Sequence, residues 1–335
     1  MARDRRRSGG HEGSALTQPF TYHRAASLDE AAQLLARPNA HPLGGGTDLL
    51  PGIEDGLVTP GSVVDLRGLS GAASIETLPD GSVAIGAAAT LRDIADEAVI
   101  RERFPALAGA CEVVGSPALR NMGTVGGNLC QRPRCWYLRR GVSCLKNGGT
   151  DCPAREGENQ YHAILDGGPC YMVHPSDPAV ALTALEARVE IVGLGTSREI
   201  PLEELYVLPR ERLEHETVLQ HGEFIGSVIL PASSSKTRQL YRKTMQREAW
   251  DFALVSIAAV RRDDCVRMVL GGVAPRPWRV PSSVEEDVAS GGLDEDSIAA
   301  LAERALYDAE PLSKNGYKVE VAASLIRDAI RALTA

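Results

Sequence analysis

The stretch that decides the fold is HPLGGGTDLL at residues 41–50, a glycine-rich turn that follows a short predicted strand. Consecutive glycines let backbone N–H groups turn toward an anion, and Thr47 adds a hydroxyl donor. A phosphate or diphosphate suits such a turn. The spacing differs from G-x-G-x-x-G, and no Gly-Lys-Ser/Thr follows, so neither a Rossmann fingerprint nor a Walker loop fits. A plain glycine turn is the alternative for this motif taken alone.

A second glycine-rich loop, GTVGGN at residues 123–128, follows later in the chain at the end of an apolar stretch. Taken alone, it is no more specific than the first loop. Two such loops in one domain favour a dinucleotide, because both can hold its diphosphate from opposite sides with N–H donors.

Five of the seven cysteines are crowded into one short segment: Cys130, Cys135, Cys144, Cys152 and Cys170. A disulfide framework is disfavoured, because the chain is long and residues 1–16 lack the apolar stretch of a secretory signal. The last four are irregularly spaced, and without a C-x-x-C pair a zinc finger is poorly matched. Four thiolates on irregular loops can hold a [4Fe–4S] cluster. A tetrahedral zinc and a set of reduced cysteines without metal remain open alternatives.

Two further motifs contain charged residues that could contact a cofactor. In HPSDP at 174–178, Asp177 opens a predicted helix, where it could cap the helix or accept hydrogen bonds from ribose hydroxyls. The histidine of this motif is interpreted as structural. In YRKTMQR at 241–247, Lys243 could reach a flavin or its phosphates, and the alternative is a solvated strand face. No residues with the pattern of acid–base or nucleophilic catalysis are identified, so no catalytic residue is predicted.

Chain length, hydrophobic periodicity and turn residues indicate helices and strands arranged in two domains. We expect a disordered arm at 1–16, a first domain at 17–220 that contains a cysteine-rich insertion at 129–172, and a C-terminal domain at 221–335. The C-terminal domain is predicted to begin with a meander and to end with two helices. The expected strands are 224–230, 238–246, 252–261 and 265–271, and the expected helices are 295–308 and 318–333.

Composition narrows the classes of function. The net charge of −8 argues against a nucleic-acid binder and against an anionic membrane surface. The apolar runs are too short to span a bilayer. With 44% hydrophobic and 24% charged residues, the chain has the composition of a soluble globular protein.

Six segments in a fixed order carry a resemblance to a known family. They are GGGTDL at 44–49, IGAAATLRDI at 85–94, RNMGTVGGN at 120–128, PSDPAVAL at 175–182, YRK at 241–243 and LGGVAPRPW at 270–278. Together they resemble the FAD-binding medium subunit of the xanthine dehydrogenase and carbon monoxide dehydrogenase family of molybdenum hydroxylases. The resemblance runs from about residue 17 to the end. It implies the α+β fold class: a vanillyl-alcohol-oxidase-type FAD domain of two α+β subdomains, followed by a C-terminal domain with a small antiparallel sheet and helices.

The resemblance also implies which residues bind FAD. The first diphosphate loop corresponds to Leu43, Gly44, Gly45, Gly46, Thr47, Asp48 and Leu49. The second corresponds to Thr124, Val125, Gly126, Gly127 and Asn128. Asp177 matches an aspartate near the cofactor, Lys243 a lysine at the flavin, and Ile225 an apolar residue beside it.

The cysteine-rich insertion is a departure from most of the family. It resembles the medium subunits of 4-hydroxybenzoyl-CoA reductase and of a bacterial aldehyde oxidoreductase, which bind an additional [4Fe–4S] cluster. That resemblance implies Cys135, Cys144, Cys152 and Cys170 as the cluster ligands, with Cys130 a non-ligand near the flavin.

The implied function is electron transfer by a flavoprotein subunit. FAD and the extra cluster would connect a small [2Fe–2S] subunit to an external acceptor, while a separate large molybdenum-cofactor subunit oxidises the substrate. The direction of electron flow stays open. We expect a cytoplasmic location, although a partner with an export signal could carry the chain with it. The alternatives are a self-sufficient FAD oxidoreductase and a non-enzymatic scaffold with a zinc-pinned loop.

Overall fold

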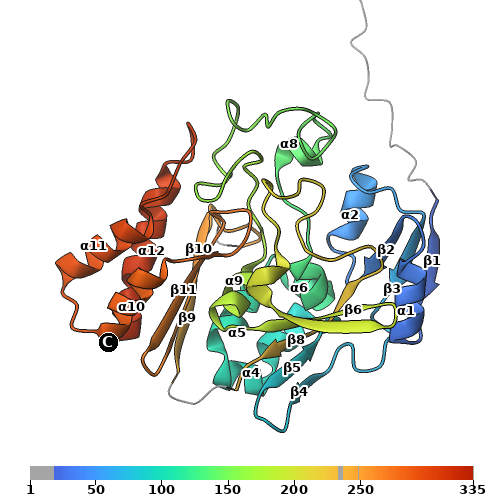
Figure 1. The fold of residues 1–335 in the computed structure, drawn as a ribbon, viewed down its shortest axis with the longest axis horizontal. Coiled ribbons are helices and arrows are strands. Elements are labelled where there is room, and N and C mark those ends of the chain that lie inside the picture. The colour runs from blue at the N-terminus through green and yellow to red at the C-terminus, as the bar shows by residue number, and fades with distance from the viewer. Residues whose placement is uncertain (1–18, 233–236, 248, 335) are drawn as a thin grey trace, which may run out of the picture.

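The computed structural model describes residues 19–232, 237–247 and 249–334, and the arm expected at 1–16 lies outside them. Three sheets with helices packed around them form the described part of the chain (Figure 1). The predicted α+β class is confirmed, as is the C-terminal arrangement of a small antiparallel sheet with helices.

The first sheet is parallel and has three strands. In sheet order they are β1 (Thr21–Arg24), β3 (Ser62–Asp65) and β2 (Ala40–Leu43). All four residues of β3 are buried, as expected for the central strand of a covered parallel sheet. Helix α1 (Leu28–Leu35) packs against this sheet, and Ser27 caps it by accepting from the backbone N–H of Glu30 at 3.2 Å. The first glycine loop leads from β2 into α2 (Leu49–Glu54).

The second sheet is antiparallel and has five strands. In sheet order they are β4 (Ile75–Thr77), β5 (Val83–Gly86), β8 (Phe224–Leu230), β6 (Arg188–Gly193) and β7 (Thr196–Pro201). Its strands share the main apolar core with helices that lie beside it. The helices of this region are α3 (Leu91–Asp96), α4 (Ala98–Arg103), α5 (Pro105–Glu112), α6 (Pro117–Met122), α7 (Val125–Leu129), α9 (Asp177–Ala184) and the short 3₁₀ helix η1 (Leu202–Leu205).

Strand β8 corrects the expected meander. It was predicted to open the C-terminal domain, but it pairs with β5 on one edge and β6 on the other. Both edges are therefore filled within the first domain. The local sequence predicts the strand correctly, because alternation is a short-range signal, whereas the choice of partner strands is not. We propose that the domain boundary falls between Leu230 and Arg238 instead of near 221.

The third sheet is antiparallel and belongs to the C-terminal part of the chain. Its strands, in order, are β12 (Trp278–Arg279), β11 (Cys265–Gly271), β10 (Val255–Arg262) and β9 (Arg238–Thr244). Three helices share an apolar core with this sheet and lie on the left in Figure 1. They are α10 (Ser282–Ser290), α11 (Glu295–Ala305) and α12 (Tyr317–Thr334). Helices α5 and α9 pack on this sheet as well, so they connect the two domains.

The cysteine-rich insertion is irregular, as expected, and α8 (Trp136–Arg139) is the one helix between α7 and α9. Its loops run over the upper end of the molecule in Figure 1. Fully buried polar side chains tie it to the corner before α12. Asn315 Nδ2 donates to the His162 carbonyl at 3.1 Å, and Asn159 Nδ2 donates to Ser313 Oγ at 3.1 Å. Hydrogen bonds to the C-terminal domain therefore help to fix a segment that has little core of its own.

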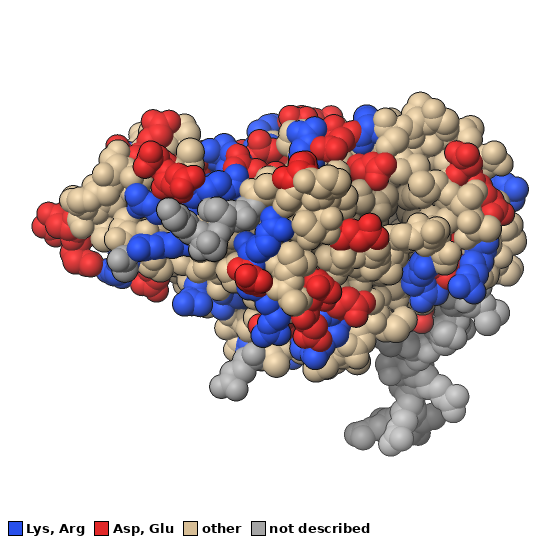
Figure 2. All heavy atoms as spheres, turned by 90° about the horizontal axis from the view of Figure 1, so that it is seen from below, with Lys and Arg blue, Asp and Glu red and all other residues tan. Residues whose placement is uncertain are grey.

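The outer surface carries both signs of charge. Figure 2 shows one face, on which acidic and basic side chains are interspersed. That face therefore offers no extended area of one sign to an oppositely charged polymer. Within the described residues, no helix has the length and apolarity required to cross a membrane.

Candidate functional site

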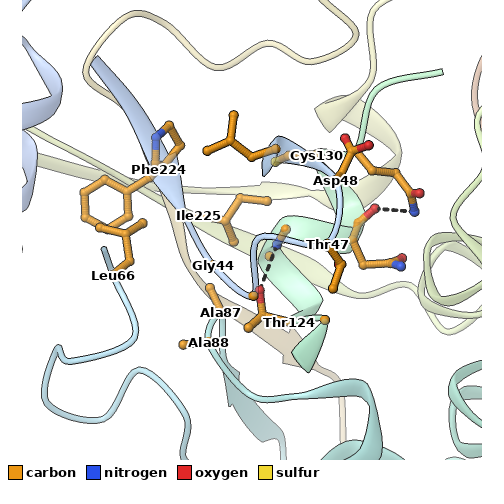
Figure 3. Close-up of a pocket in the computed structure, with 18 of the residues that line it drawn as sticks. Gly44, Thr47, Asp48, Leu66, Ala87, Ala88, Thr124, Cys130, Phe224 and Ile225 are labelled. Atoms are coloured by element: carbon orange, nitrogen blue, oxygen red, sulfur yellow. Dashed lines mark hydrogen bonds between the residues drawn. The ribbon is translucent and has the colours of Figure 1, made fainter. Parts of the chain in front are cut away.

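A cavity of about 920 Å³ lies between the first glycine loop, the five-stranded sheet and the cysteine-rich insertion. This volume is near the upper end of the range for small-molecule and cofactor sites, about 300–1,000 Å³. Figure 3 shows Gly44 and Thr47 close to Thr124, with the apolar side chains of Phe224 and Leu66 on another side of the cavity. The cavity thus combines a loop of backbone donors with an apolar wall.

The first glycine loop presents unpaired backbone donors. Within the described structure, the N–H groups of residues 44–48 make no hydrogen bond to a protein acceptor. These residues are only half-buried, and all of them line the cavity. Backbone N–H groups removed from water need an acceptor, and an anion can satisfy several at once. The loop therefore has the donors that a diphosphate requires.

In the second glycine loop, which is also predicted to hold the diphosphate, most of the N–H groups are already used within the chain. Val125 N donates to Ala89 O at 3.0 Å, and Gly126 N donates to Ala87 O at 2.9 Å. The Thr124 hydroxyl accepts from Gly127 N at 3.3 Å and so caps α7. This loop builds the wall of the cavity, whereas the first loop offers the free donors.

The two loops are packed so tightly that side chains are excluded between them. A Cβ at Gly45 would lie 1.6 Å from the carbonyl oxygen of Met122, and one at Gly44 would lie 2.3 Å from Thr124 Oγ1. From sequence, these glycines suggest a close approach of backbone to phosphate. In the structure, glycine is needed at these two positions because the two loops contact each other there.

Asp48 joins the first loop to the cysteine-rich insertion. Its Oδ2 accepts from the backbone N–H of Arg132 at 2.7 Å. Its Oδ1 accepts from Arg139 at 2.8 Å and lies 2.9 Å from the Arg134 guanidinium. Hydrogen bonds to a charged acceptor are stronger than neutral ones, so this carboxylate is a strong anchor between the two segments.

Asp177 lies at the boundary between the cavity and the C-terminal sheet. Its oxygens accept from Tyr241 at 2.6 Å and from Lys243 at 2.7 Å. Burial raises the pKa of Asp177, while the Lys243 charge and both hydrogen bonds oppose that rise. The structure excludes one alternative for each residue. The helix cap is Ser176, and Lys243 is buried in an ion pair instead of lying on a solvated strand face.

Most of the predicted FAD residues line the cavity. They are Gly44, Gly45, Gly46, Thr47, Asp48, Leu49, Thr124, Gly126, Gly127, Asn128, Asp177 and Ile225. Leu43, Val125 and Lys243 do not line it: the first two are buried in apolar clusters, and Lys243 lies behind Asp177. Cys130 lines the cavity, and burial raises the pKa of its thiol to about 12. Three further lining residues were not predicted, because small and apolar residues give no distinct signal in the sequence: Leu66, Ala87 and Phe224.

The four predicted ligand cysteines surround one small second site. Cys135, Cys144, Cys152 and Cys170 all line a space of about 10 Å³, together with Lys146. The thiols of Cys152 and Cys170 hydrogen bond to each other, which lowers the pKa of Cys152 to about 6. Among the described residues, no group of three or more His, Cys, Asp or Glu is arranged to hold a metal ion.

Comparison with known proteins agrees with this geometry. Residues 18–233 match the FAD binding domain in molybdopterin dehydrogenase, and residues 240–333 match the CO dehydrogenase flavoprotein C-terminal domain. The aldehyde oxidoreductase FAD-binding subunit PaoB of Escherichia coli is 35% identical over 314 residues, covering 90% of this chain and 94% of that protein. The carbon monoxide dehydrogenase medium chain of Hydrogenophaga pseudoflava is 24% identical, covering 93% and 96%.

Solved structures show the same fold. Quinoline 2-oxidoreductase from Pseudomonas putida aligns with a TM-score of 0.72 at 23% identity, over 95% of this chain and 99% of that one. The predicted vanillyl-alcohol-oxidase-type FAD domain, followed by a C-terminal domain, is thereby confirmed. The free donors of the first glycine loop, the two family matches and the shared fold lead to one conclusion: this chain belongs to the FAD-binding subunits of the molybdopterin dehydrogenase family, to which xanthine and carbon monoxide dehydrogenases belong.

Proposed function

We propose that this chain holds FAD with its diphosphate on the first glycine loop and serves as the flavoprotein subunit of a heteromeric molybdenum hydroxylase. The observation that carries the proposal is the run of unpaired N–H groups at 44–48 on the large cavity. When bound, FAD would supply a centre that accepts electrons singly and releases them in pairs. The chain's own residues would bind and orient it.

The remaining predicted residues would act in two ways. Thr47 and the loop N–H groups would contact the diphosphate directly, whereas the second loop, with Thr124 to Asn128, would support the first from behind. Ile225 would form part of the apolar wall, and Asp177, held by Lys243, would offer its carboxylate at the cavity edge.

The partners in this proposal are a large molybdenum-cofactor subunit and a small [2Fe–2S] subunit. Electrons would pass between the [2Fe–2S] subunit and an external acceptor by way of this chain, and substrate oxidation would occur on the large subunit. Relatives named as medium chains of glyceraldehyde and carbon monoxide dehydrogenases support an assembly of this kind. The cytoplasm is the proposed location.

We further propose that Cys135, Cys144, Cys152 and Cys170 bind a [4Fe–4S] cluster. Four thiols that line one site form the donor set that such a cluster takes. The free space between them is about 10 Å³, so the loops must move apart to admit it. The backbone there is held mainly by turns, because α8 spans only four residues.

Purification without oxygen tests the function. We expect bound flavin, iron and acid-labile sulfide, and co-purification with the two partner subunits when all three are expressed together. Zinc without flavin would support the scaffold alternative, and substrate turnover by the isolated chain would support a self-sufficient oxidoreductase.

Cysteine substitutions test the ligand set. Cys144→Ser and Cys152→Ser should each lose most of the iron while retaining FAD, because both side chains face the proposed cluster site and not the large cavity. Cys265→Ser is the matched control, because Cys265 is exposed on β11. Iron contents equal to that of the control would show that the ligand assignment is wrong.

A further inference from the structure

The cysteine-rich insertion brings three arginines against the loop that offers the unpaired N–H groups. Arg132, Arg134 and Arg139 line the large cavity, and each contacts the carboxylate of Asp48 at the end of that loop. Arg132 does so through its backbone N–H, whereas the other two use their guanidinium groups. Residues 44–48 contain no basic residue. The insertion therefore places beside this loop the positive charge that the loop itself lacks.

The basic side chains in this region outnumber the carboxylates that contact them, because two carboxylates are each shared by two cations. The pairs, with their N–O distances, are Asp48–Arg134 at 2.9 Å, Asp48–Arg139 at 2.8 Å, Glu216–Arg132 at 3.0 Å and Glu216–Lys146 at 2.9 Å. The charge of Asp55 also acts on Arg134, but more weakly than that of Asp48. Positive charge is therefore in excess here, and a diphosphate, which is negative on both phosphates, would balance it.

Arg132 and Arg134 keep N–H groups available for a ligand. Arg132 faces Glu216 through Nε, and within the described part of the chain its two terminal nitrogens have no hydrogen-bond partner. Arg134 uses its terminal nitrogens once each, toward Asp48 and toward the Gln131 side chain at 3.3 Å, and so retains further N–H groups. The two side chains are 28% and 27% exposed and line the cavity, so their charges can be reached from it.

Arg139 has a different role, which is to hold the insertion in place. Its Nε donates to the Pro133 carbonyl at 3.0 Å, and one terminal nitrogen is shared between Asp48 at 2.8 Å and the Arg132 carbonyl at 3.3 Å. Its side chain is only 13% exposed. The two arginines that can reach a ligand are therefore Arg132 and Arg134.

Both of these arginines are close to the donor loop. Arg134 contacts Asp48, which follows the glycines, and its Cζ lies 5.1 Å from the centroid of the Phe252 ring, which helps to fix the guanidinium. The charge of Arg132 acts on His41, which precedes the glycines in β2 and lines the same cavity. Burial, followed by this charge, lowers the pKa of His41. The glycines of the loop thus have basic groups near the residues on both sides of them.

We propose that Arg132 and Arg134 bind the FAD diphosphate together with the first glycine loop, so that the cysteine-rich insertion supplies the cations of the flavin site. The inference rests on the proposed FAD site and is independent of what the four cysteines bind. Backbone N–H groups orient the phosphate oxygens, and guanidinium groups add charge-assisted hydrogen bonds to them. Tight binding of FAD would then require the insertion to be in place.

Substitution by glutamine removes the charge and keeps a polar side chain. In Arg132→Gln and in Arg134→Gln the carboxylate keeps its second cation, so neither variant leaves a buried acid unpaired. Arg132→Lys and Arg134→Lys keep the charge without the guanidinium group. Arg140→Gln is the matched control, because Arg140 lies in the same insertion but is exposed and does not line the cavity.

Titration of the flavin-free full-length protein with FAD, followed by quenching of flavin fluorescence, gives the dissociation constant at low and at high salt. Urea unfolding of the same flavin-free proteins measures their stability in parallel. We expect each glutamine variant to bind FAD about tenfold more weakly at low salt, because it loses a charge-assisted hydrogen bond to phosphate. Salt screens such contacts, so FAD affinity should depend less on salt in these variants than in wild type. The lysine variants should recover part of the affinity, and the control should match wild type.

The outcomes separate this inference from the function on which it depends. Wild-type protein that binds no FAD would overturn the FAD site itself. Wild-type binding, with both glutamine variants as tight as Arg140→Gln, would overturn only the role of the arginines. Equal losses in the lysine and glutamine variants, or losses matched by lower stability in urea, would also overturn it, because side-chain packing and not charge would then be the cause. A loss in one glutamine variant alone would assign the role to that arginine and overturn it for the other.

Discussion

Replacement of Gly45 by alanine tests the contact between the two glycine loops. The added Cβ would lie 1.6 Å from the Met122 carbonyl oxygen and 2.4 Å from its carbon. Both partners are backbone, so no flexible side chain can move aside. To reach even a tight contact of 3.0 Å, the loops must separate by more than an ångström. The donors at 44–48 would then move relative to the rest of the cavity.

The expected magnitude follows from the cost of overpacking. Forced displacement of well-packed groups typically costs about 1–3 kcal/mol. If FAD binds only the closed arrangement, that cost appears as roughly a 5- to 150-fold weaker FAD affinity. The assay is titration of flavin-free protein with FAD, followed by quenching of flavin fluorescence. Urea unfolding of the flavin-free protein measures the stability change separately.

Gly52→Ala is the matched control. Gly52 lines the same cavity, but a Cβ there would meet Val58 Cγ2 at 3.7 Å, an ordinary contact. Alanine within a helix is favoured over glycine by about 0.5–1 kcal/mol, so this variant should bind FAD normally and unfold no earlier than wild type. The reasoning fails if Gly45→Ala binds FAD as tightly as Gly52→Ala.

Two further predictions concern buried ionisable groups. Lys243→Met should lower the free energy of unfolding of the flavin-free chain by about 3–5 kcal/mol in urea, because it leaves Asp177 buried without its cation. Adding Asp177→Asn to this variant should recover part of the loss, and strictly additive losses in the double variant would contradict the reasoning. Burial lowers the pKa of His174 to about 4, against about 6.5 in the unfolded chain, so the unfolded state takes up a proton first on acidification. The free energy of unfolding should therefore fall between pH 6.5 and pH 4, by up to about 3 kcal/mol from this group. His174→Gln should show a shallower decline than wild type. Equal declines in the two proteins would contradict the contribution of His174.

Elements set by short-range patterns could be predicted from the sequence. The caps of α1 and α3 are Ser27 and Thr90, each of which accepts from a backbone N–H three residues later, so the whole cap lies within one short segment of sequence. The bounds of β11 equal the predicted 265–271, because alternation and the turn at 262–264 lie within the segment itself. In these cases the determining partner is a few residues away.

Features that depend on distant partners were not predictable in the same way. Lys243 is predicted to lie at the flavin, but its burial beside Asp177, 66 positions earlier, gives no signal in its own segment. The sheet to which β8 belongs is decided by β5 and β6, and the need for glycine at 45 by Met122. Each motif could be located from the sequence, but the physical reason for it lies in a contact that the motif does not contain.

The charged groups of the cysteine-rich insertion explain how a segment with little core keeps a fixed position. Lys146, at the cysteine site, pairs with Glu216 at 2.9 Å, and Glu216 also pairs with Arg132 at 3.0 Å. Arg132 and Glu216 line the large cavity, and the Arg132 backbone holds Asp48. Since buried ion pairs add little net stability, their contribution here is to select one arrangement. Glu216 and Arg132 thus connect the cysteine site to the proposed FAD site through one set of ion pairs.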